Sequence, residues 1–250
     1  MDALKFTLSG RTAFFKKPDV NTYYYFTYGN IHKVALLGIL GAINGYKGYN
    51  EQQKNKNEIY PEFYERLQRT KIGIVPRNNK GDISKKIQIF NNSVGYASKE
   101  QGGNLIVKEQ WLEEPKWDIY ILLQGECERE LAERIIKLNF KYIPYLGKND
   151  HIANITDIDI IENVEKATNI YNIDSLFIKE SFKFVEYEDD FEDESEEYVP
   201  IYKYEEMLPI TLEKETNKYN LKTFVYTNSK LNCVNDSLVY RCNKKMIFFF

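Results

Sequence analysis

The sequence has 250 residues, of which 43% are hydrophobic, so it can form one large domain or one domain with a smaller appended part. Its longest apolar run, Val34 to Ile43, is well short of the ~20 residues that span a bilayer, which argues against a transmembrane helix. Three cysteines without a Cys-x-x-Cys pair argue against a disulfide framework or a zinc site. Because the first residues also lack an apolar signal core, we expect a cytoplasmic protein with no membrane partner.

The net charge of -3 conceals a strong asymmetry along the chain. Residues 186–197 contain nine acidic side chains and no basic one, whereas residues 1–110 contain 17 Lys or Arg against 9 Asp or Glu, a net charge of +8. The basic first half suits a polyanionic partner such as a nucleic acid. The acidic run is interpreted as a solvated loop, in preference to a mimic of nucleic acid or a binding segment for a basic partner.

Hydrophobic periodicity predicts an α+β fold with a first domain over residues 1–165. Its elements are expected in the order β-α-β-β-α-β, which is typical of ferredoxin-like and RRM-like domains. The strands are expected at residues 3–8, 71–76, 117–124 and 153–161, and the helices at about residues 31–44 and directly after Gly125. The continuous apolar run at 117–124 is typical of a strand in the middle of a sheet.

The first expected helix contains two glycines in its interior. Asn30 is expected to cap its N-terminus, and Gly45 is expected to end it in the left-handed conformation. Almost every side of the helix is apolar, which predicts burial. Since Gly38 and Gly41 each cost about 1 kcal/mol relative to alanine inside a helix, we expect another backbone to pack closely against them.

Residues 77–111 are expected to form a long inserted β-hairpin, with strands near 83–90 and 104–112. Around its start, a single acid, Asp82, opposes seven cations, which are Arg66, Arg69, Lys71, Arg77, Lys80, Lys85 and Lys86. These cations either grip a nucleic-acid backbone or guard an exposed sheet edge, and the two interpretations carry equal weight. Residues 166–250 are expected to form a smaller, mostly β C-terminal region, with strands at 176–187, 199–204, 223–227, 238–242 and 246–250.

Residues 9–30 are expected to form a long loop that mixes cations with aromatic rings. Arg11, Lys16 and Lys17 can neutralise phosphates, while Phe14 and Phe15 can stack on unpaired bases. The following helix N-terminus, with His32 and Lys33, adds free N–H groups and a favourable dipole for an anion. The alternative is an ordinary solvated loop whose rings fill the core, and the spacing alone slightly favours that alternative.

The same segment resembles a known family. The strand ending in Leu8-Ser9-Gly10, the run Phe14-Phe15-Lys16-Lys17-Pro18 and the helix sequence from Leu36 to Ile43 resemble the N-terminal signature of the fifth CRISPR-associated (Cas) protein family, of the RAMP superfamily. Two later segments, 145–149 and 205–210, are similar to other parts of that family. Its members are subunits of type I Cascade surveillance complexes.

The resemblance implies an antiviral-defence subunit that binds the 5′ handle of CRISPR RNA (crRNA) and caps Cascade beside its backbone and large subunits. Target DNA would be met only indirectly, through the complex, and the hairpin would act as a thumb that touches the neighbouring backbone subunit. No cofactor and no metal are expected. The residues predicted to bind RNA are Gly10, Arg11, Phe14, Phe15, Lys16, Lys17, His32, Lys33, Arg77, Lys80, Lys85, Lys86, Lys148 and Asn149.

Some members of this family cleave precursor crRNA without metal, using a Tyr, a Lys and a His. By position, Tyr46 and Lys116 would take two of these roles, but Trp117 follows Lys116 where the family pattern has His. His32 is then the substitute candidate. This departure favours RNA binding without catalysis, and leaves a metal-independent endoribonuclease as the alternative. A third hypothesis is a protein-binding module whose basic face meets an acidic partner.

Overall fold

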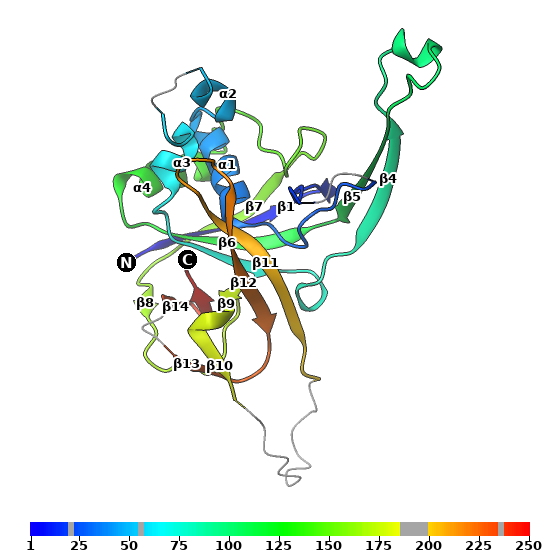
Figure 1. Ribbon diagram of the computed structural model, residues 1–250. Helices are drawn as coiled ribbons and strands as arrows, with labels where there is room; N and C mark the ends of the chain where they lie inside the picture. The colour runs from blue at the N-terminus through cyan, green and yellow to red at the C-terminus, as the bar shows by residue number, and fades with distance from the viewer. Residues whose placement is uncertain (20–22, 55–57, 186–199, 235–237) are drawn as a thin grey trace.

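The computed structural model describes residues 1–19, 23–54, 58–185, 200–234 and 238–250 (Figure 1). The predicted acidic loop at 186–197 therefore lies outside the described residues. The described chain combines a few helices with several antiparallel sheets, which confirms the predicted α+β class. Within these ranges, no helix is both long and apolar enough to cross a bilayer.

A four-stranded antiparallel sheet forms the centre of the molecule, with the strand order β3-β6-β1-β7. Its strands are β1 (Ala3–Ser9), β3 (Ile72–Pro76), β6 (Lys116–Leu122) and β7 (Asn154–Ile161). With α1 (Lys33–Asn44) and α4 (Glu126–Ile136), they follow one another along the chain in the predicted β-α-β-β-α-β order. β6 lies between two neighbours, as predicted from its mostly apolar sequence, in which Asp118 is the one acidic residue.

The two faces of this sheet are covered by different parts of the chain. Because side chains alternate along a strand, Trp117 belongs to the core under the helices, whereas Tyr120 belongs to a second cluster with Ile247 and Phe249. The main chains of Phe250 and Ile72 also exchange hydrogen bonds of 3.1 and 3.2 Å at the sheet edge. The C-terminal region thus shares its core with the first 165 residues.

The ends of α1 agree only in part with the prediction. Gly45 is left-handed (φ 84°) and ends the helix as expected. The N-cap, however, is His32, whose Nδ1 accepts a hydrogen bond from the Ala35 N–H. Asn30 is fully buried two residues earlier, where its amide donates to the Gly81 carbonyl and accepts from the Trp117 indole. The expectation for Asn30 is therefore wrong, because its two partners, Gly81 and Trp117, are distant in the sequence.

The two helix glycines have different roles. A Cβ on Gly41 would lie 2.4 Å from the Cβ of Phe63, on α3 (Glu62–Leu67), so the expected close approach holds at that position. A Cβ on Gly38 would meet only the far end of the Phe63 ring, at 4.0 Å. The expected close packing is therefore wrong for Gly38, which lies on an open side of α1.

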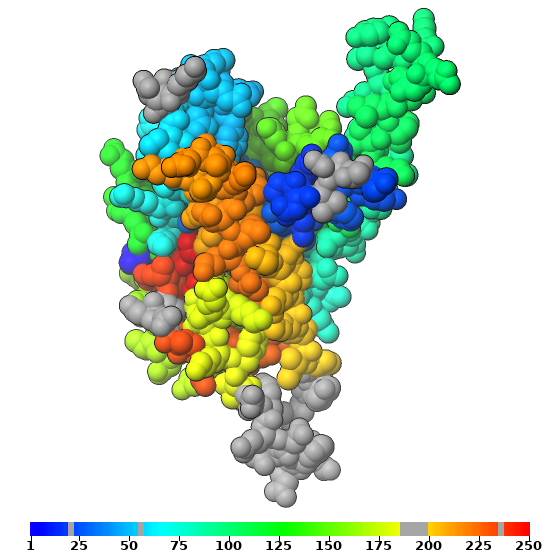
Figure 2. All heavy atoms as spheres, in the orientation of Figure 1, coloured from blue at the N-terminus to red at the C-terminus, as the bar shows by residue number. Residues whose placement is uncertain are grey.

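The predicted hairpin consists of β4 (Lys85–Asn91) and β5 (Ile106–Glu113), and it projects from the body of the molecule (Figures 1 and 2). At its base, β5 also pairs with β2 (Thr12–Ala13). The remaining helical elements are α2 (Tyr49–Gln52), η1 (Asn79–Gly81), η2 (Ala97–Lys99) and η3 (Lys179–Ser181).

The C-terminal region is mostly β, as predicted. Its longest pair, β11 (Lys203–Leu212) with β12 (Tyr219–Thr227), forms an antiparallel hairpin that reaches α1. Its other strands are β8 (Glu165–Lys166), β9 (Phe177–Ile178), β10 (Phe182–Phe184), β13 (Leu231–Cys233), β14 (Val239–Cys242) and β15 (Lys245–Phe248).

Candidate nucleic-acid interface

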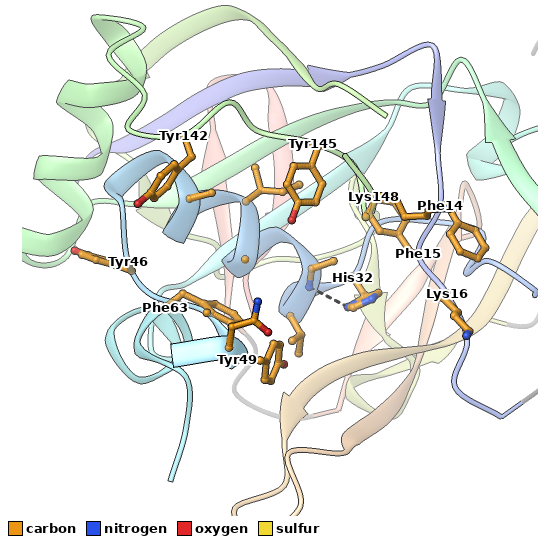
Figure 3. Close-up of a pocket in the computed structure, with 18 of the residues that line it drawn as sticks. Phe14, Phe15, Lys16, His32, Tyr46, Tyr49, Phe63, Tyr142, Tyr145 and Lys148 are labelled. Atoms are coloured by element: carbon orange, nitrogen blue, oxygen red, sulfur yellow. Dashed lines mark hydrogen bonds between the residues drawn. The ribbon is translucent and has the colours of Figure 1, made fainter. Parts of the chain in front are cut away.

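A groove of about 1100 Å³ runs along the open side of α1 (Figure 3). Its floor includes Ala35, Gly38 and Ala42, whose small side chains leave room above the helix. Its walls come from the loop after β1, from the segment around α2, and from the loop between α4 and β7. We call this feature the α1 groove.

Tyrosine rings dominate the walls of the α1 groove. Tyr49, Tyr142 and Tyr145 all line it and are 39, 56 and 44% exposed. Such rings offer open faces on which unpaired bases can stack, at about 1–3 kcal/mol per base. Sequence analysis missed all three as site residues, although Tyr145 lies three residues before the predicted Lys148. The signal that could have found them is the clustering of tyrosines within five residues of the loop glycines Gly48 and Gly147.

Two predicted cations line the groove, Lys16 and Lys148 (Figure 3). Lys16 is exposed, and its Nζ lies 4.0 Å from the centre of the Tyr25 ring, a cation–π contact that leaves its charge available. Lys148 is bound to the buried carboxylate of Glu109 at 3.0 Å, so its charge is largely compensated. Asn149, next to it, is exposed.

The loop that carries Lys148 is held tightly against the loop after β1. Gly147 has φ 92°, and a Cβ there would lie 1.8 Å from the Phe14 carbonyl oxygen, so no larger residue fits. The Phe14 N–H also donates to the Leu146 carbonyl at 3.0 Å. The predicted Gly10 has a similar packing role, since a Cβ there would lie 2.6 Å from the Leu146 side chain. Both glycines act by allowing close approach.

The two phenylalanines of the loop do not offer free ring faces. Phe14 and Phe15 are 4 and 3% exposed, and the Phe15 ring packs against His32 and Trp117. In this structure neither ring can stack on a base, so the alternative interpretation, rings that fill the core, is correct for both. Their position directly before two lysines in the sequence gave no sign of this, because Phe15 packs against the distant Trp117 and Phe14 lies under the loop of Gly147.

Lys17, which was predicted to contact phosphates, is instead paired inside the protein. Its Nζ forms a 2.8 Å ion pair with Glu206 on β11, and the same carboxylate accepts hydrogen bonds from the Gly29 N–H and the Tyr204 hydroxyl. Lys17 therefore fastens the loop to β11. Arg11 is exposed and does not line the groove.

The predicted anion site at the N-terminus of α1 is internal. Burial lowers the pKa of His32 to about 3, so its imidazole is neutral at pH 7. Burial also lowers the pKa of Lys33 to about 8, and its Nζ donates to the main-chain oxygen of Phe250 at 3.0 Å. Neither side chain brings an accessible charge to a phosphate, so this part of the prediction is corrected.

The predicted cations of the hairpin base lie away from the groove. Arg77 donates to Asp118 at 2.7 Å, and Lys86 pairs with Glu113 at 3.4 Å. Lys80 and Lys85 are exposed. The predicted set thus divides between the α1 groove, the interior and the hairpin base, and it does not form one surface.

The three residues of the endoribonuclease alternative are not brought together. Tyr46 and His32 lie at opposite ends of α1, which at 1.5 Å per residue places their backbones about 20 Å apart. Lys116 precedes Trp117 on β6, and alternation directs it to the sheet face opposite α1. The hydroxyl of Tyr46 contacts the Asn44 amide at 3.2 Å and the Cys127 sulfur at 3.6 Å, and burial raises its pKa. Within the described residues, no three His, Cys, Asp or Glu side chains gather to hold a metal ion.

No protein-family model and no curated protein matches the sequence. Among solved structures, a chain of a CRISPR RNA-guided surveillance complex is similar, with a TM-score of 0.50 at 10% identity over 93% of this chain and 91% of that chain. A CRISPR protein from Archaeoglobus fulgidus is similar with a TM-score of 0.52 at 13% identity over 99% and 98%. The chain therefore shares its fold with CRISPR-associated proteins, in agreement with the sequence resemblance at that level.

Proposed function

We propose that this protein is an RNA-binding subunit of a type I CRISPR surveillance complex (Cascade), and that its α1 groove holds the 5′ handle of crRNA. The observation that carries the proposal is the groove itself, which combines exposed tyrosine faces with the available charge of Lys16. It occurs in a chain that shares its fold with a subunit of an RNA-guided surveillance complex. Stacking platforms beside a basic rim are the usual means of holding single-stranded RNA.

The proposal differs from the sequence-based prediction in the residues that do the work. Stacking is assigned to Tyr49, Tyr142 and Tyr145, because they are exposed where Phe14 and Phe15 are buried. Phosphate contact is assigned to Lys16 first, because Lys17 and Lys33 are already engaged inside the protein. With fewer free cations than predicted, stacking supplies a larger share of the affinity.

We assign the projecting hairpin to contact with a neighbouring backbone subunit of Cascade. Ile87, Ile89 and Ile106 are exposed on one face of it, with Lys108 and Gln110 in the same layer. Exposed aliphatic side chains grouped on a projection are typical of protein–protein contacts. The large subunit would lie nearby, and target DNA would be met through the assembled complex.

We further propose that the subunit does not cleave RNA, because Tyr46, His32 and Lys116 are too far apart to act on one phosphate. Incubating the purified protein with precursor crRNA in EDTA tests this directly. Specific cleavage that is lost in Tyr46→Phe would establish the endoribonuclease alternative and end the non-catalytic proposal.

Sequencing the RNA that co-purifies with the protein tests handle binding. We expect a repeat-derived 5′ tag, and we expect Tyr49→Ala and Tyr145→Ala each to weaken its retention by roughly 5- to 100-fold. The matched control is Tyr171→Ala, which removes a ring that is 66% exposed but lies outside the α1 groove. Absence of the tag from the wild-type protein would refute handle binding, and equal effects of all three variants would refute the groove assignment.

A further inference from the structure

The projecting hairpin is held to the body of the protein near its base. β2 pairs with the end of β5, and the main chain of Tyr25 exchanges hydrogen bonds of 2.9 Å with Lys108 and Gln110 on the same strand. Farther out, within the part of the chain that the structure describes, no hydrogen bond or ion pair joins residues 91–106 to the body. The angle of the hairpin therefore depends on the contacts around its base.

A loop between α4 and β7 reaches this base and contacts both strands of the hairpin. We call residues 145–152 the clasp loop. The Nζ of Lys148 lies 3.1 and 3.0 Å from the two carboxylate oxygens of Glu109, on β5. The same Nζ lies 5.4 Å from the centre of the Phe90 ring, on β4. One side chain of the clasp loop thus holds β4 and β5 together against the body.

The acid that Lys148 meets is buried. The Glu109 side chain is 7% exposed, and it also accepts a hydrogen bond of 2.8 Å from the Trp111 indole. Removing one partner of a buried ion pair is strongly destabilising, because the other charge is left unpaired. Lys148 is therefore committed to Glu109, unlike the exposed Lys16, and cannot leave it for a phosphate without that loss.

His151 makes a second contact between the clasp loop and the hairpin base. It is 2% exposed, and its Nδ1 lies 2.6 Å from the hydroxyl of Thr12, on β2. Its ring also packs edge-on against the Trp111 ring of β5, with 4.6 Å between the ring centres. The clasp loop thus holds β5 both by an ion pair and by aromatic packing.

The clasp loop is closed by its own hydrogen bonds. The Leu146 N–H donates to the His151 carbonyl at 2.7 Å, and the His151 N–H donates to the Lys148 carbonyl at 3.0 Å. The same loop carries Tyr145, which lines the α1 groove (Figure 3). One closed loop therefore forms part of the groove wall and also contacts the hairpin.

We propose that the clasp loop fixes the angle of the projecting hairpin relative to the α1 groove, and that Lys148 and Glu109 are its positioning residues. This role takes the place of the phosphate contact that the sequence predicted for Lys148. A ligand seated against Tyr145 would meet the hairpin at one set angle. The inference concerns the free protein and does not require RNA in the groove.

Hydrogen exchange of the free protein, followed by mass spectrometry, tests the clasp. Lys148→Met keeps the aliphatic stem but leaves Glu109 unpaired, so we expect exchange in β4 and β5 to rise by roughly 10- to 100-fold. Glu109→Gln combined with Lys148→Met should recover most of the protection, because its amide oxygen still accepts from Trp111 and no buried charge remains.

The matched control is Lys86→Met. It removes a 3.4 Å ion pair with Glu113 between the same two strands, where the side chains are 37 and 43% exposed, and should change exchange by less than about 3-fold. Unchanged exchange in β1 and β6 would show that each variant is folded. Equal exchange in Lys148→Met and Lys86→Met would overturn the inference, and so would a double variant no better protected than Lys148→Met.

Binding of the co-purifying RNA provides a further readout. Lys148→Met should leave the slope of log affinity against log salt near the wild-type value. A slope lowered by about 0.7, with exchange in the hairpin unchanged, would make Lys148 a phosphate ligand and would overturn the inference. Failure of the wild-type protein to bind RNA would count against the proposed function alone, because the exchange measurement still decides whether the clasp exists.

Discussion

Two basic segments of this protein look alike in sequence but differ in the structure. Residues 11–33 and residues 66–86 both contain several cations and few acids. In the first, Lys16 faces the α1 groove among tyrosine rings, while Lys17 and Lys33 are engaged by partners on other elements. In the second, Arg77 is bound to the buried Asp118 on the side of the sheet away from α1. The charge of a Lys or Arg side chain can attract a phosphate only if no acidic side chain already pairs with it. In both segments, some of the cations are already engaged in this way and others are not.

The largest expected effect concerns Asp118, at the hairpin base. Its buried carboxylate contacts Arg77 at 2.7 Å, Lys245 at 3.7 Å and Lys5 at 4.0 Å, and it accepts from Thr7. We expect Asp118→Asn to lower the free energy of unfolding by about 2 kcal/mol in urea titrations, because the partly exposed cations lose their shared partner. A loss below about 0.5 kcal/mol would show that these cations are not structural.

The pH dependence of the same variant provides a second check. Burial raises the pKa of Asp118, but hydrogen bonds from Arg77 and Thr7 and the charge of Lys5 outweigh burial, so the net pKa is lowered. A lowered carboxyl pKa stabilises the fold above the unfolded value of about 4 and loses that contribution as the pH falls further. Asp118→Asn should therefore reduce acid destabilisation below pH 4, which unfolding curves recorded at successively lower pH would measure.

The next effect concerns His32, on the groove side. The folded pKa of His32 is about 3, below the unfolded value of 6.5. Between these two pH values the unfolded chain therefore binds a proton that the folded protein does not bind. Stability should fall as the pH drops below 6.5, by about 2 kcal/mol at pH 5 from this residue. His32→Asn, which retains an N-cap acceptor, should lower stability at pH 7 but flatten that slope.

A second histidine, His151, also contributes to the loss of stability at low pH. Burial also lowers its pKa, so part of the acid sensitivity should persist in His32→Asn. Unfolding curves at pH 7, 6 and 5 measure both contributions. If stability depends on pH equally in wild type and His32→Asn, His32 is not buried as a neutral imidazole. That result would contradict the reason for excluding His32 from RNA binding.

The smallest effect separates the two adjacent lysines of the loop. Lys16→Glu should weaken RNA binding severalfold and lower the slope of log affinity against log salt by about 0.7, because one phosphate contact is lost. Lys17→Glu should leave that slope near the wild-type value, but should reduce stability by about 1 kcal/mol, because it sets a second carboxylate beside Glu206. Filter binding between 50 and 300 mM salt and thermal unfolding distinguish them. If both variants change the slope equally, Lys17 also reaches RNA.

Much of the fold was predictable because its signals are local. The periodicity of 3–8 and 117–124, the amphipathic pattern after Gly125 and the left-handed Gly45 each depend on neighbouring residues, and the observed elements agree to within a few positions. The N-cap of α1 was not predictable in this way, because Asn30 is held by Gly81 and Trp117. For the candidate site, the prediction pointed to the loop after β1 and the N-terminus of α1, but not to the open side of α1 or to the tyrosines that line it.

By itself, the sequence determined the α+β class, the order of the central elements, the projecting hairpin and a basic first half, because periodicity, turn residues and charge counts are properties of short segments. Only the tertiary structure decided which side chains can meet a ligand. Lys17 is 189 positions from Glu206 and Lys33 is 217 from Phe250. Whether a charge is free or paired, and whether a ring is open or buried, depends on such distant partners, which the fold alone brings together.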